Sequence, residues 1–89
     1  MNETKTESKP VLYHLEIYEP NSERDVLIAF RTAAPFMAFA AGDVIGTRGW
    51  KVEGVPMRIG VRLVEHLIWE LDTHVSHKIM VLTTKVADA

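Results

Sequence analysis

Residues 11–18 alternate between apolar and mixed side chains, and this alternation constrains the fold more than any other feature of the chain. The odd positions carry Val11, Tyr13, Leu15 and Ile17. Successive side chains of a β-strand point to opposite faces, so a period of two is typical of a strand with one buried face. β-Branched and aromatic residues are also enriched in strands. The segment therefore predicts a half-buried strand.

A second strand is predicted at residues 25–32, where the sequence reads DVLIAFRT. The intervening Glu19-Pro20-Asn21-Ser22 has turn chemistry, because proline pre-sets φ and Asn and Ser can bond their own backbone. A connection this short places the two strands side by side and antiparallel. Residues 11–32 are thus expected to form a hairpin.

The middle of the chain is less regular. Pro35 argues against a central strand at residues 33–41, whose alanines suit a short helix or a close-packed loop. Gly42-Asp43 predicts a turn into a short strand at Val44-Ile45. The glycines and proline of residues 46–56 leave room only for a loop.

Residues 58–73 allow two interpretations. A helical stripe is formed by Leu63, Val64, Leu67, Ile68 and Leu71. Read as a strand, the segment places on one face Val61, Leu63, Leu67, Trp69 and Leu71, with Glu65 as an interruption. The helix lacks an N-cap before Met57 and contains Gly60. A turn at residues 72–74 and an evident strand at residues 78–86 favour the strand.

These elements predict a single all-β domain at residues 10–87, a small, partly open barrel of about five strands with hairpins at residues 11–32 and 61–86. The alternative is an α+β domain in which residues 58–73 form a helix packed on a sheet. Residues 1–9 are polar and too poor in apolar groups to offset their ordering entropy, so we expect a disordered tail there.

Composition excludes several classes of function. The 89-residue chain has no cysteine, which rules out disulfides, thiolate metal ligands and cysteine catalysis. Its formal net charge of −2 gives no overall attraction to nucleic acid or an anionic membrane. The longest uncharged stretch, residues 32–42, falls short of the ~18 residues that indicate a membrane helix. The first residues have no apolar signal region, so we expect a cytoplasmic protein without a membrane partner.

Four short segments together resemble a known group of sequences. They are Pro35-Phe36, Gly42-Asp43-Val44-Ile45, Val64-Glu65-His66-Leu67-Ile68-Trp69-Glu70 and His77-Lys78-Ile79-Met80. Over residues 11–86 this succession resembles a group of small, uncharacterised bacterial β-rich domains. The resemblance implies a β fold and a bacterial origin, and it brings no activity with it.

Histidines and carboxylates gather near residue 72. Asp72, His74 and His77 offer the nitrogen and oxygen ligands that zinc, nickel and copper accept. A zinc site needs three or four ligands held by further contacts, and this spacing matches no established metal motif. We therefore predict no metal and no cofactor, with these three residues as the candidates if one binds.

A metal-dependent or acid–base enzyme is the first alternative function, built on His66, Glu70, His74 and His77. On a helix His66 and Glu70 would share one face within reach of each other. On a strand they stand roughly 13 Å apart, so the strand interpretation makes His66 a partly buried histidine bonded to a neighbour.

A basic stretch suggests the second alternative, weak binding of single-stranded nucleic acid. It contains Arg48, Trp50, Lys51, Arg58 and Arg62, with Glu53 as its one acid. A small barrel could stack a base on the tryptophan and track the backbone with the cations. The twelve acids of the chain argue against nucleic acid as a partner.

The apolar segment at residues 33–41 is the best functional clue. Phe36, Met37 and Phe39 lie in it without any charge. The segment either closes an open barrel end or forms a surface for a partner, since exposed apolar patches mark interaction sites. Aromatic and Met side chains dominate protein contacts, so Phe36, Met37, Phe39 and Trp50 are the predicted partner-binding residues. The sequence thus favours a non-catalytic protein-interaction module, with another protein or a second copy of the chain as its partner.

Overall fold

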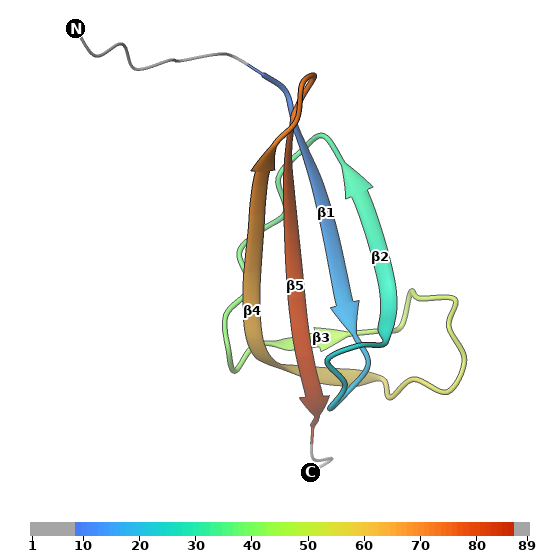
Figure 1. Cartoon of the computed structure of the whole chain (residues 1–89). Coiled ribbons are helices and arrows are strands. Elements are labelled where there is room, and N and C mark those ends of the chain that lie inside the picture. Colours follow the sequence, from blue (N-terminus) through green and yellow to red (C-terminus); the bar gives the residue numbers. More distant parts are fainter. Residues whose placement is uncertain (1–8, 87–89) are drawn as a thin grey trace, which may run out of the picture.

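The computed structural model describes residues 9–86, and in this part of the chain every regular element is a strand. The strands are β1 (Val11–Tyr18), β2 (Val26–Thr32), β3 (Val44–Gly46), β4 (Arg58–Glu70) and β5 (Val75–Lys85). They form one sheet in the order β2-β1-β5-β4-β3, curved into an open half-barrel (Figure 1). The predicted all-β, partly open barrel is confirmed. The alternative helix at residues 58–73 is wrong, because β4 occupies most of that range.

Both predicted hairpins are present. β1 pairs antiparallel with β2, and β4 pairs antiparallel with β5 from Ile59↔Lys85 to Glu70↔Val75. A parallel pairing of β1 with β5, from Val11↔Val75 to Ile17↔Val81, joins the two hairpins into one sheet. The predicted tail at residues 1–9 lies outside the described residues except for Lys9, as does residue 87 of the predicted domain.

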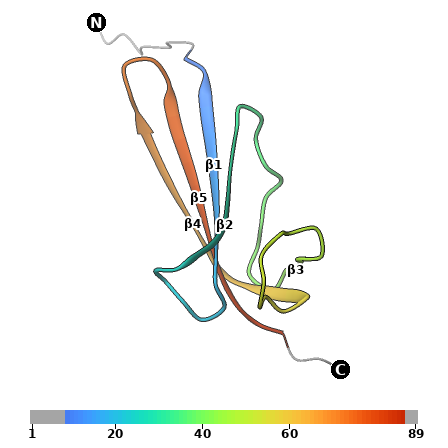
Figure 2. The same cartoon turned by 90° about the vertical axis from the view of Figure 1, so that its right-hand side faces the viewer.

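The core lies on one face of this sheet, called here the inner face. It is made by six buried side chains from β1, β4 and β5, namely Leu15, Ile17, Ile59, Val61, Ile79 and Val81. Figure 2 shows the segment between β2 and β3 running along one side of the sheet. Phe36 and Phe39 of that segment pack against the core, as does Trp50 of the next loop. The segment therefore has a structural role, and it contains neither helix nor strand.

A β-bulge divides β4 into two parts. The register changes from Val61↔Thr83 to Leu63↔Leu82, which leaves Arg62 as the extra residue. An extra residue inverts the alternation of side chains beyond it. Val61 thus points to the inner face, as Val64 does, whereas Leu63 points to the opposite, outer face. The prediction that Val61 and Leu63 share one face was wrong for this reason.

The predicted turn at Gly42-Asp43 ties the covering segment to β4. Gly42 has a φ of 99°, a conformation that side chains with a Cβ rarely adopt. The Gly42 amide donates to the Val61 carbonyl at 2.9 Å, and the Val61 amide donates to the Asp43 carbonyl at 2.8 Å. The Asp43 carboxylate accepts a bond from the Ala40 amide at 2.8 Å. These contacts fix where the segment returns to the sheet.

Candidate interaction surface on strand β4

The edge of β4 that faces away from β5 is largely unpaired. β3 covers only Arg58–Gly60 of this strand, through Val44↔Gly60, Ile45↔Ile59 and Gly46↔Arg58. The bonds of Val61 to the Gly42-Asp43 turn extend the pairing by one residue. From Leu63 to Glu70, no strand among residues 9–86 pairs with this edge. The edge thus exposes a long row of backbone groups.

The alternation of hydrogen bonds identifies those groups. The Leu71 amide donates to the His74 carbonyl at 2.8 Å, so the backbone of Leu71 points toward β5. Backbone groups of an antiparallel strand alternate in direction from one residue to the next. The amides and carbonyls that point outward, away from β5, are therefore those of Val64, His66, Ile68 and Glu70. No backbone hydrogen bond from the described part of the chain reaches them.

Large apolar side chains on the same segment are exposed. Their exposed fractions are 43% for Leu63, 49% for Leu67, 64% for Ile68, 42% for Trp69 and 41% for Leu71. Leu63, Leu67 and Trp69 share the outer face, which the segment between β2 and β3 leaves uncovered (Figure 2). A long apolar edge strand is a template for pairing with another chain. We call residues 62–70 the β4 edge.

The outer face becomes polar toward the centre of the sheet. Glu16 of β1 accepts a hydrogen bond from the Tyr18 hydroxyl at 2.9 Å and lies 3.1 Å from the Lys78 ammonium. Burial, followed by the hydrogen bond to Glu16 and the charge of that carboxylate, raises the pKa of Tyr18. The exposed apolar side chains of the outer face are thereby concentrated on β4.

On the inner face two histidines meet. His66 Nδ1 lies 2.9 Å from His77 Nε2, and the ring of Tyr13 lies 5.5 Å from the His77 ring. The three rings line a small pocket of about 150 Å³ with Phe36 and Met37. Burial, and next the nearby His66, lower the pKa of His77. The prediction that His66 bonds a neighbouring residue is confirmed, but His66 is exposed rather than partly buried.

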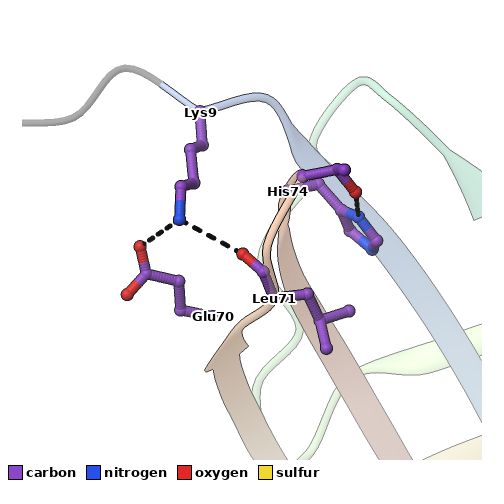
Figure 3. A network of polar contacts seen from close by, with 5 residues as sticks. Lys9, Glu70, Leu71 and His74 are labelled. Carbon is purple, nitrogen blue, oxygen red and sulfur yellow. Dashed lines mark hydrogen bonds and ion pairs between the residues drawn. The ribbon is translucent and has the colours of Figure 1, made fainter.

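The other candidate metal ligands do not join this pair. His74 lies after the β4–β5 turn, where its Nδ1 is 3.0 Å from the Thr73 hydroxyl. Glu70 binds the Lys9 ammonium at 2.6 Å, and Lys9 also donates to the Leu71 carbonyl at 3.2 Å (Figure 3). Within residues 9–86, no group of three or more His, Asp or Glu side chains could hold a metal ion. Of the four residues named for an enzyme, the structure brings together only His66 and His77.

The basic stretch is spread over the loop before β4 and over β4 itself. Arg48 and Arg58 line an open hollow together with Met57. Trp50 is half-buried against the core, so part of its ring is used within the chain. Lys51 and Arg62 are exposed.

The predicted partner-binding residues differ in how much surface they offer. Phe36, Phe39 and Trp50 are half-buried, whereas Met37 is 90% exposed. Sequence reasoning did not single out Leu63, Leu67, Ile68 and Trp69, whose side chains the structure leaves exposed. The sequence contained a signal for this exposure, because residues 63–69 place apolar side chains on both faces of a strand. A core on one side of the sheet can bury only one of those faces.

Comparisons with known proteins return no relative. No protein-family model matches the chain, and neither a curated protein nor a solved structure matches it. No helix in the described part of the chain has the length and apolar character to cross a membrane.

Proposed function

We propose that this protein is a non-catalytic interaction module that associates with a second copy of itself through the β4 edge. The observation that carries the proposal is the combination, on residues 62–70, of outward-pointing backbone groups and exposed apolar side chains. Natural edge strands are usually short, charged or covered, which prevents such pairing. Here Leu67, Ile68 and Trp69 follow one another without a charge.

Association would pair the free backbone groups and cover the exposed apolar side chains at the same time. Antiparallel pairing of two β4 edges would satisfy the outward amides and carbonyls of each copy and continue the sheet across the dimer. It would also cover Leu63, Leu67 and Trp69 with the same side chains of the other copy. A chain of this length buries a modest fraction of its surface alone, so pairing would add to its stability.

The proposal puts the interface on the β4 edge instead of on the four partner-binding residues predicted from the sequence. Met37 is exposed but lies on the segment between β2 and β3, and Phe36, Phe39 and Trp50 pack against the core. A bacterial origin and a cytoplasmic location belong to the proposal too. The bacterial origin rests on the resemblance of the four short segments to bacterial β-rich domains, and a chain without cysteine is compatible with a reducing compartment.

Sedimentation velocity from low micromolar to near-millimolar protein tests the proposal. We expect the wild-type chain to dimerise and Leu67→Glu to stay monomeric with an unchanged circular dichroism spectrum, because each copy would add a carboxylate to an edge that already carries Glu65, and like charges across paired strands are destabilising. Met57→Glu is the matched control, since Met57 is 60% exposed and lies before the β4 edge. It should dimerise like the wild type. A wild-type chain that remains monomeric throughout, or a Leu67→Glu variant that dimerises normally, would overturn the proposal.

A further inference from the structure

We infer that the two copies pair in one antiparallel register, with His66 of each copy opposite His66 of the other. This inference rests on the proposed function and specifies its geometry. In a symmetric antiparallel pair, the residues that precede the central residue face those that follow it in the other copy. The choice of central residue therefore decides every contact along the edge.

Backbone direction limits that choice. The outward groups belong to alternate residues, namely Val64, His66, Ile68 and Glu70. Each must face an outward residue of the other copy to form hydrogen bonds. This condition holds when the symmetry axis passes through a residue and fails when the axis passes between two residues. The central residue must also leave a long ladder between the bulge at Arg62 and the end of β4 at Glu70.

Centring on His66 pairs the β4 edge from Leu63 to Trp69. Counting outward from His66 gives the facing pairs Glu65–Leu67, Val64–Ile68 and Leu63–Trp69, each formed twice. Two of these three pairs are apolar on both sides. Apolar residues facing each other across strands stabilise a sheet.

Neighbouring registers are less complementary. Centring on Glu65 places the Glu65 carboxylates of both copies opposite each other, which is destabilising. Centring on Leu67 places Glu65 opposite Trp69 and Glu70 opposite Val64. A charged residue then faces an apolar one in two pairs, against one such pair in the His66 register. Centring on Val64 makes the strand of the second copy overlap the part of β4 that β3 already covers. Centring on Ile68 shortens the ladder to residues 66–70.

Cysteine cross-linking distinguishes the registers. The chain has no cysteine of its own, so single variants give no background. In the His66 register, residue 65 of one copy faces residue 67 of the other as a non-hydrogen-bonded pair. The Cα atoms of such a pair are about 4.5 Å apart, within the range that a disulfide spans. Both side chains lie on the exposed outer face, away from the core.

We expect a mixture of Glu65→Cys and Leu67→Cys chains to form the heterodimeric disulfide under mild oxidation, well above the yield of either variant alone. Dominant cross-linking of Glu65→Cys with itself would centre the pairing on Glu65, and that of Leu67→Cys with itself would centre it on Leu67. Either result would overturn the His66 register, as would a dimer in sedimentation without the mixed disulfide. These outcomes leave the proposed function intact, whereas a wild-type chain that stays monomeric in sedimentation would overturn both.

Discussion

His66 Nδ1 and His77 Nε2 lie 2.9 Å apart, and their hydrogen bond joins β4 to β5 on the inner face of the sheet. One imidazole must donate and the other accept, so the bond requires at least one neutral ring. Because burial and the neighbouring His66 lower the pKa of His77, the folded state disfavours its protonation. The stability of the fold should therefore depend on pH through this histidine pair.

We predict that stability falls as the pH drops below about 6.5, the ordinary histidine value. The unfolded chain protonates His77 at its ordinary pKa, whereas the folded chain does so only at lower pH. The unfolded state therefore binds more protons in this window, and acid favours unfolding. Urea unfolding at several pH values and one fixed protein concentration measures the effect.

His77→Gln should flatten this pH profile between pH 7 and 5. His14→Gln is the matched control, because His14 lies on the outer face of β1 and away from the pair. A wild-type profile that stays flat, or one that His14→Gln flattens as much as His77→Gln does, would contradict the prediction.

Phe36 and Met37 are neighbours with opposite environments, and their replacement should have different effects. Phe36→Ala should lower the free energy of unfolding by about 2 kcal/mol, less than the 3–5 kcal/mol typical of fully buried sites because Phe36 is half-buried. Met37→Lys should change stability by less than about 0.5 kcal/mol. Chemical denaturation of both variants checks these values.

Met37→Lys also tests where association occurs. With pairing through the β4 edge, this variant should remain a dimer by light scattering. A folded, monomeric Met37→Lys protein would instead locate the interface on the segment between β2 and β3.

Folding should not depend on a divalent metal. The described residues bring together two imidazoles without a third acidic or histidine ligand, and a structural zinc site needs four ligands. Thermal melts in excess chelator and with added zinc should therefore coincide. A chelator-induced loss of several degrees would refute this prediction, since a bound metal stabilises only the folded state.

The sequence by itself determined the strands and their local pairing. The alternation at residues 11–18, the turn residues at 19–22 and the strand-forming run at 78–86 act over short distances. Side-chain direction and turn geometry are properties of neighbouring residues, so both hairpins could be predicted. The missing cap and Gly60 likewise favoured a strand over a helix at residues 58–73.

Only the tertiary structure decided which faces and edges stay free. The parallel pairing of β1 with β5 joins segments far apart in the chain, and no local pattern encodes it. The bulge at Arg62 arises from the register between β4 and β5, and it inverts every side chain from Leu63 onward. That inversion sends His66 to the inner face beside His77 and leaves Leu63, Leu67 and Trp69 on the outer one. The short β3 then leaves the rest of β4 unpaired, because a strand of three residues cannot cover one of thirteen.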